Sequence, residues 1–131
     1  MKILVFNGSP KKEKSDTMHI TRAFLDGMKE TAAQEIHPIN VTDRHIEFCR
    51  GCFACKYNGG HCVIDDDMRM ILERMLASDL LLFSFSIYCY GMPAMLKNLI
   101  ERTLPLSSMA MARRTGAMST SGSGIIRISD I

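Results

Sequence analysis

Short apolar runs alternate with segments of helical period along the first hundred residues. Residues 2–6 are mainly apolar and lead into Asn-Gly-Ser-Pro, which predicts a buried strand followed by a loop. Beyond that loop, apolar positions recur every three or four residues, so we expect an amphipathic helix capped by Ser15 or Asp16. Its predicted buried stripe is Ile20, Thr21, Phe24, Leu25 and Met28.

Two further strands are predicted from their apolar patterns. Residues 35–41 alternate between polar and apolar side chains, and Pro38 lies among them. Because proline has no N–H to donate to a ladder, we expect this strand at an edge of the sheet. Residues 80–87 place apolar side chains on both faces, which is typical of a central strand in a parallel sheet.

Two further helices are expected, one after residue 64 and the other after residue 92. Asp65, Asp66 and Asp67 precede the first of these helices, where carboxylates cap free amides and meet the positive end of the helix dipole. Pro93 suits the first turn of the second. The predicted buried faces are Met68, Ile71, Leu72, Met75 and Leu76 on the first helix, and Met95, Leu96, Leu99 and Ile100 on the second.

The order of these elements predicts an α/β fold with a parallel sheet and helices on its faces. Residues 107–131 break the pattern, since they are rich in Ser, Gly, Met, Ala and Arg. We expect them to form an atypical tail, loosely ordered or adding one edge strand at residues 124–128. The main domain is therefore predicted to span residues 1–106.

Composition excludes several classes of protein. A chain of 131 residues with 47% hydrophobic and 23% charged residues is typical of one globular domain. A net charge of +2 gives no reason to expect nucleic acid or an anionic membrane as partner. No apolar run approaches the roughly 18 residues of a transmembrane helix. We therefore expect a cytoplasmic protein.

The loop after the first strand is a candidate phosphate site. A loop between a parallel strand and the next helix presents backbone amides and a helix dipole, and both favour an anion. Gly8 is expected to let the chain turn sharply here. The candidate donors are Ser9, Lys11, Ser15 and Thr17. A plain turn with solvated lysines would have a similar sequence, because neither the Walker loop nor the dinucleotide glycine fingerprint is present.

A second candidate loop follows the third strand. In open α/β sheets, ligands bind beyond the carboxyl ends of the strands, and this loop lies at the same edge as the first one. Two tyrosines and a glycine there suit a flat ring, although an ordinary strand-to-helix loop is the alternative. The loop residues are Ile87, Tyr88, Cys89, Tyr90, Gly91 and Met92.

Four of the five cysteines crowd into fourteen positions, as Cys49, Cys52, Cys55 and Cys62. In a cytoplasmic protein such crowding favours metal or redox chemistry over structural disulfides. Four thiolates would bind a cubane iron–sulfur cluster, and tetrahedral zinc is the competing metal. Free or disulfide-forming thiols are the third alternative. Cys89 stands apart and is expected to be buried or adjacent to a bound ring.

The two loops together resemble the flavodoxin-like family of NAD(P)H-dependent FMN reductases. The resemblance rests on residues 2–10, on Ser15 and Thr17, and on residues 88–103, and it covers about residues 1–106. It implies a three-layer sandwich that binds the FMN phosphate at Ser9, Lys11, Ser15 and Thr17 and wraps the ring with residues 87–92. No side chain is assigned as an obligatory catalytic acid or base, because the flavin carries the redox chemistry.

The resemblance also implies partners. In such proteins the flavin accepts a hydride from NAD(P)H and passes electrons to a small-molecule or protein acceptor. The cysteine spacing resembles that of the iron–sulfur flavoproteins, a branch of the same family. The usual fold of this family has five parallel strands, so the resemblance implies that this chain is truncated after its third strand–helix unit. A homodimer or higher homo-oligomer is expected, because such a shortened sheet exposes an edge that a second copy would cover. An FMN-binding electron carrier and a truncated, non-catalytic remnant are the alternative functions.

Overall fold

The computed structural model describes residues 1–107, which form a three-stranded parallel sheet flanked by helices. The sheet has the order β2-β1-β3, so β1 is its central strand. The strands are β1 (Lys2–Asn7), β2 (Glu35–Asn40) and β3 (Leu80–Ser84). The helices are α1 (Asp16–Thr31), α2 (Ala54–Tyr57), α3 (Met68–Leu76) and α4 (Ala94–Glu101), with short 3₁₀ turns η1 (Lys12–Lys14), η2 (Val41–Asp43) and η3 (Leu104–Leu106). The predicted α/β fold with a parallel sheet is confirmed.

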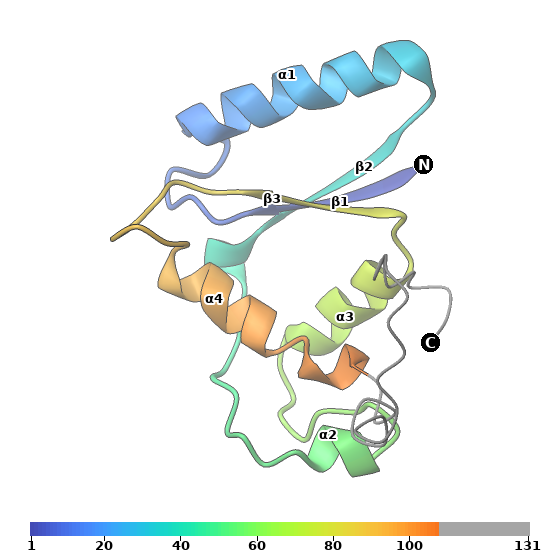
Figure 1. Ribbon diagram of the computed structural model, residues 1–131, viewed down its shortest axis with the longest axis vertical. Helices are drawn as coiled ribbons and strands as arrows, with labels where there is room; N and C mark the ends of the chain where they lie inside the picture. The colour runs from blue at the N-terminus through green and yellow to red at the C-terminus, as the bar shows by residue number, and fades with distance from the viewer. Residues whose placement is uncertain (108–131) are drawn as a thin grey trace, which may run out of the picture.

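The helices cover both faces of the sheet, as Figure 1 shows, with α1 on one face and α3 and α4 on the other. Because side chains alternate along a strand, β1 supplies both cores. Ile3 and Val5 pack with Leu25 of α1, whereas Leu4 and Phe6 belong to the larger core with α3 and α4. This arrangement is the three-layer sandwich that the resemblance implied.

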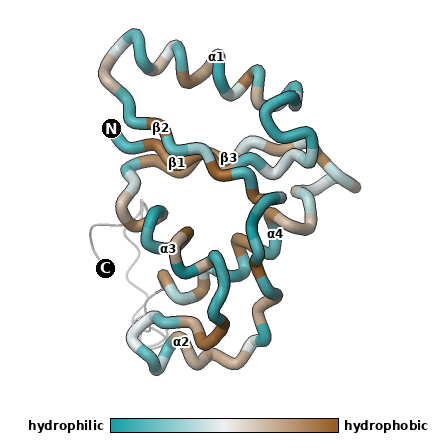
Figure 2. Tube along the Cα trace, turned by 180° about the vertical axis from the view of Figure 1, so that it is seen from behind, coloured by the Kyte–Doolittle hydropathy of each residue, from teal (hydrophilic) through white to brown (hydrophobic). Residues whose placement is uncertain are grey.

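The predicted buried stripe of α1 is confirmed at Thr21, Leu25 and Met28 but is wrong at Ile20 and Phe24. Ile20 and Phe24 are 72% and 53% exposed, while Met18, Thr21 and Leu25 are buried. Residues 18, 21 and 25 are spaced by three and four positions, so they also satisfy the helical period. Figure 2 shows hydrophilic and hydrophobic positions alternating along α1, so hydropathy alone does not show that the buried face extends to Met18 rather than to Ile20 and Phe24.

The strands match their predicted positions with two differences. β2 is an outer strand that pairs with β1, as Pro38 predicted, and Pro38 lies opposite Val5. β3 ends at Ser84 rather than at residue 87, because its partner β1 ends at Asn7 in the same register. β3 is also an outer strand in the part of the chain that the structure describes, not the central strand expected from its apolar faces.

Other predicted features shift by a few residues. The segment that carries the clustered cysteines, where no helix or strand was predicted, contains the short helix α2. Leu76 and Met95 are exposed rather than buried, because each lies beside the face that its helix turns to the core. The tail prediction for residues 107–131 falls outside the described residues, apart from Ser107. Between residues 1 and 107, no helix is both long and apolar enough to cross a membrane.

Gly8 is required by close packing rather than by the sharp turn expected from the sequence. Its backbone does not lie in the left-handed region. A Cβ at this position would lie 3.2 Å from Cβ of Phe85 and 3.4 Å from Cδ2 of Leu96. The absence of a side chain therefore lets the first loop pack directly against the start of the second.

Substituting Gly8 with alanine is expected to lower the free energy of unfolding by about 1 kcal/mol. Overpacking typically costs about 1–3 kcal/mol, and alanine offsets part of this cost because it lowers the conformational entropy of the unfolded chain. Urea unfolding measures the change. The control is G27A in α1, where a Cβ meets nothing within 4 Å, and a gain of about 0.5–1 kcal/mol is expected because alanine favours a helix interior. Equal stability changes in the two variants would contradict the packing argument.

Candidate cofactor-binding site

The two candidate loops lie side by side at the carboxyl edge of the sheet. Asn7 and Ser84 end β1 and β3 at the same register, and the Gly8 amide donates a 2.8 Å hydrogen bond to the Ser84 carbonyl. Thr21 of α1 donates a 2.8 Å hydrogen bond from its hydroxyl to Oγ of Ser84. Figure 1 shows both loops leaving this end of the sheet together. The fold thus brings together two segments that are about eighty residues apart in sequence.

The first loop is held by its own polar side chains. Oδ1 of Asn7 accepts the Ser9 amide at 3.0 Å, and Nδ2 of Asn7 donates to Oδ1 of Asn40 at 3.0 Å. Ser15 caps α1, because its Oγ accepts the Met18 amide at 3.3 Å, as predicted. Asn7, Ser9 and Ser15 are all buried. The loop is therefore preorganised before anything binds to it.

Unused donors remain at the start of α1. Among residues 1–107, the backbone amides of Asp16 and Thr17 have no hydrogen-bond acceptor. The Thr17 hydroxyl lies beside them and donates to Oγ of Ser15 at 3.2 Å. Lys12 is paired with Asp43 at 2.6 Å, whereas Lys11 forms no ion pair in the described part of the chain. Free amides, a helix dipole and a lysine together form an arrangement that suits a phosphate group.

The second loop forms a tight turn that projects into solvent. Tyr88 and Gly91 exchange two backbone hydrogen bonds of 2.8 Å, and the central residues Cys89 and Tyr90 have φ values of 45° and 65°. Positive φ is unfavourable for both side chains, and such strain occurs preferentially at ligand clamps and active sites. Ile87, Tyr88, Tyr90 and Met92 are exposed. Cys89 is exposed as well, so of its two expected positions burial is wrong, and a place beside a bound ring stays a prediction.

The four clustered cysteines meet at a different place, beyond the layer formed by α3 and α4. Cys49, Cys52, Cys55 and Cys62 all line one small pocket between the α2 segment and the end of α4. Gly51 and Phe53 have positive φ and reverse the chain on either side of Cys52. Within residues 1–107, no three His, Cys, Asp or Glu side chains lie close enough together to hold a single metal ion. The thiols therefore share a pocket without converging on one point.

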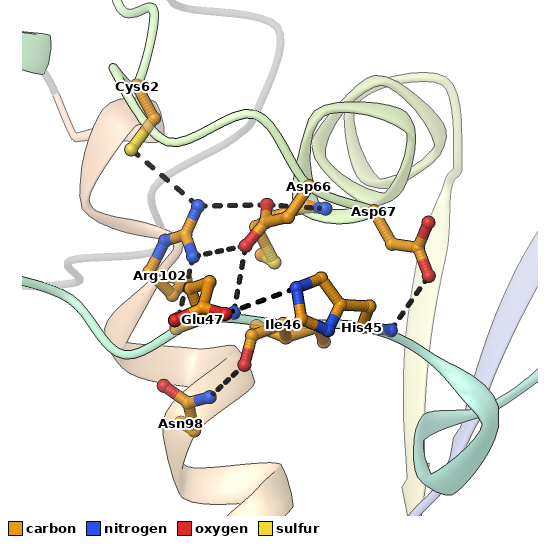
Figure 3. Close-up of polar contacts among 9 residues, drawn as sticks. His45, Ile46, Glu47, Cys62, Asp66, Asp67, Asn98 and Arg102 are labelled. Carbon is orange, nitrogen blue, oxygen red and sulfur yellow. Dashed lines mark hydrogen bonds and ion pairs between the residues drawn. The ribbon is translucent and has the colours of Figure 1, made fainter.

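A buried ion pair fixes this pocket to the rest of the fold. Arg102 and Asp66 form hydrogen bonds of 2.6 and 3.0 Å between guanidinium and carboxylate, and their side chains are 1% and 0% exposed. Arg102 also donates to the Glu47 carbonyl at 2.7 Å and to Sγ of Cys62 at 3.6 Å. Figure 3 shows Asp66 and Arg102 at the centre of these contacts. The pair thus joins the start of α3, the end of α4 and two segments of the cysteine loop.

The electrostatics of the pair favour both charges. Burial by itself raises the pKa of Asp66, but hydrogen bonds from Arg102 and from the amides of Glu47 and Met68 outweigh it, so this pKa lies below its ordinary value. Burial likewise lowers the pKa of Arg102, and the Asp66 carboxylate more than offsets it, leaving that pKa raised. The two groups therefore remain ionised at neutral pH.

The acidic triplet does more than cap α3. Asp66 accepts the Met68 amide at 3.0 Å, as a capping residue does, but its other oxygen accepts the Glu47 amide at 2.9 Å. Asp67 accepts the His45 amide at 2.9 Å and makes no side-chain cap. Arg102 was not among the residues predicted to be functional. The only sign in the sequence is an arginine at the end of an otherwise apolar helix face, and this pattern does not predict an ion pair with a residue 36 positions away.

A family model described as NADPH-dependent FMN reductase matches residues 1–129. The chain belongs to this family. The match continues beyond residue 106, where the resemblance was expected to end, into the segment predicted to be an atypical tail. Both candidate loops of this FMN reductase family member lie at the carboxyl edge of the sheet, the edge at which flavodoxin-like folds bind FMN.

Iron–sulfur flavoproteins are among the relatives of this FMN reductase family member. The chain is 34% identical over 126 residues to one from Methanosarcina thermophila, covering 94% of this chain and 64% of that protein. It is 34% identical over 106 residues to one from Methanocaldococcus jannaschii, covering 81% of this chain and 53% of that protein. The chain thus spans between about half and two thirds of the length of these relatives.

Solved structures confirm the flavodoxin-like fold. An FMN-dependent NADH-azoreductase from Bacillus anthracis, solved in complex with FMN, superposes with a TM-score of 0.60 at 19% identity, covering 79% of this chain and 56% of that one. A second azoreductase from Bacillus anthracis has a TM-score of 0.62 at 17% identity, covering 79% of this chain and 55% of that one. At these identities the similarity concerns the fold.

Proposed function

We propose that this chain binds FMN at the carboxyl edge of its sheet and transfers electrons from NAD(P)H to an acceptor. The observation that carries the proposal is the convergence of the two loops, joined by the hydrogen bond from Gly8 to Ser84, beside free amides at the start of α1. Family membership supports FMN as the ligand, because the matching family is that of the NADPH-dependent FMN reductases.

The residues of the first loop have distinct proposed roles. The amides of Asp16 and Thr17, the Thr17 hydroxyl and the Lys11 ammonium would bind the phosphate. Ser9 and Ser15 are buried and hold the loop in place, and Ser15 does so as the cap of α1. The turn at residues 87–92 would contact the ring. Bound FMN supplies the hydride chemistry with the nicotinamide.

We further propose that Cys49, Cys52, Cys55 and Cys62 hold a [4Fe-4S] cluster. All four thiols line one pocket, and the relatives named iron–sulfur flavoproteins support this assignment. A single zinc ion needs its four ligands within about 2.3 Å of one point, whereas a cubane binds one thiolate at each of four separate corners. Thiols that share a pocket without converging match the second requirement better.

The proposed function is tested by anaerobic purification of the chain. Absorbance and FMN content are measured, and iron and acid-labile sulfide are assayed on the same sample. Oxidised flavin that is bleached by NADH or NADPH is the expected result. If an added chemical reductant bleaches the flavin but NADH and NADPH do not, the protein is an electron carrier instead. A colourless protein that takes up no added FMN would overturn the proposal.

The proposal that the four clustered cysteines hold the cluster is tested with cysteine-to-serine variants. C55S and C62S are each expected to lose most of their iron and sulfide while retaining FMN, because four thiolates are needed for the cluster. C89S is the control, since Cys89 lies in the ring loop and not in the cysteine pocket. Iron that stays at the wild-type level in C55S and C62S would refute the proposed ligand set.

A further inference from the structure

Arg102 contacts the cysteine pocket from within the fold. It is 2% exposed, follows α4 directly, and lines the pocket together with all four cysteines. One of its terminal nitrogens, Nη2, lies 3.6 Å from Sγ of Cys62. Its Nε is buried and has no hydrogen-bond partner among residues 1–107. A permanent cation therefore lines the thiol pocket, with one of its terminal nitrogens against a thiol.

The orientation of this guanidinium is fixed by groups outside the pocket. Asp66 accepts from both terminal nitrogens of Arg102, and the Glu47 carbonyl accepts from Nη1. Asp66 is itself held by the amides of Glu47 and Met68. Because the planar guanidinium is held along one side, its Nη2 has no freedom to turn away from Cys62. Figure 3 shows this chain of contacts ending at the Cys62 sulfur.

We infer that Arg102 is a positioning residue that donates a hydrogen bond to the Cys62 thiolate and thereby raises the reduction potential of the proposed cluster. The inference rests on the proposed cluster function and concerns this chain's own arginine. One-electron reduction adds one negative charge to the cluster and its thiolates, with the electron supplied by the flavin or by an added reductant. A buried cation and an N–H donor at a ligand sulfur stabilise that added charge.

The experiment compares redox titrations of the wild-type holoprotein and three variants, all prepared anaerobically with their iron, sulfide and FMN contents measured. R102K retains the charge, but an ammonium held by Asp66 cannot also reach Cys62 as the guanidinium fork does. The double variant D66N/R102Q removes both charges, so it leaves no unpaired buried ion. R74K makes the arginine-to-lysine change at an exposed position of α3 and serves as the matched control.

We expect the cluster of R102K to be harder to reduce than that of the wild type, and the cluster of D66N/R102Q harder still. The expected loss in the double variant is at least tenfold in the equilibrium constant for reduction, which is about 59 mV for a one-electron couple. R74K should match the wild type. Unchanged potentials in cluster-loaded R102K and D66N/R102Q would overturn the inference and leave the cluster itself intact. A wild-type protein without iron and sulfide would overturn the cluster proposal and this inference together.

Discussion

Replacing Asp66 with alanine is expected to lower the free energy of unfolding by about 3–5 kcal/mol. The change leaves the charge of Arg102 buried without its partner, and breaking a buried pair on one side costs this much. It also removes the acceptor for the Glu47 and Met68 amides. Since the whole stability of a small domain is about 5–15 kcal/mol, the loss is a large part of it. Urea unfolding followed by circular dichroism measures the change.

The neighbouring D65A variant is the matched control. Asp65 is exposed and makes no side-chain hydrogen bond within residues 1–107, so its removal is expected to change stability by less than about 0.5 kcal/mol. Similar losses in D65A and D66A would mean that the triplet acts through its total charge. A loss confined to D66A would confirm that the buried contacts of Asp66, with Arg102 and with the two amides, carry the effect.

The same pair predicts a pH dependence. Because the folded-state pKa of Asp66 lies below the unfolded value, its contribution to stability is fully present above about pH 4 and is lost as the pH falls through the lower, folded pKa. Wild-type stability should therefore fall more steeply with acid than that of D66N. Parallel pH profiles in the two proteins would show that Asp66 titrates alike in the folded and unfolded states.

The sequence predicted the sheet better than the helix faces, for a physical reason. A strand buried on both faces is apolar at nearly every position, so residues 2–6 and 80–84 stand out without knowledge of their neighbours. A helix of mixed composition has several rows of similar hydropathy. On α1, the sequence identifies Thr21 and Leu25 correctly, but only the position of the sheet decides whether the buried face extends to Met18 or to Ile20 and Phe24.

One part of the candidate site could also be predicted from the sequence, and another part could not. Parallel strands place their carboxyl ends at one edge, so the meeting of the two loops followed from the order of elements. The contact between Arg102 and Cys62 did not, because it depends on how the 14 residues between Glu47 and Cys62 fold back toward the end of α4. Neither spacing nor residue type encodes that path. Its start is held where the amides of His45 and Glu47 donate to the carboxylates of Asp67 and Asp66, and these contacts form only once the fold brings the two segments together.

Substituting Thr17 with aspartate is expected to weaken FMN binding by roughly 30- to 1,000-fold while leaving the fold intact. A carboxylate beside the free amides of Asp16 and Thr17 would lie where the phosphate is proposed to bind. Two like charges about 4 Å apart near a protein surface repel by about 4 kcal/mol, and each 1.4 kcal/mol is tenfold in affinity. The same carboxylate stabilises the start of a helix by about 0.3–1 kcal/mol, so affinity and stability should change in opposite directions.

Binding of riboflavin distinguishes an effect on the phosphate site from an effect on the ring site. It carries the same ring without the phosphate, so T17D should bind riboflavin as the wild type does, and its loss of FMN affinity should shrink as salt screens the repulsion. T17N has nearly the same shape as T17D without the charge and should lose less than about tenfold in FMN affinity. Quenching of flavin fluorescence measures the FMN and riboflavin affinities of the wild type, T17D and T17N. Equal losses for FMN and riboflavin in T17D would place the phosphate elsewhere and leave the start of α1 as an ordinary capped helix.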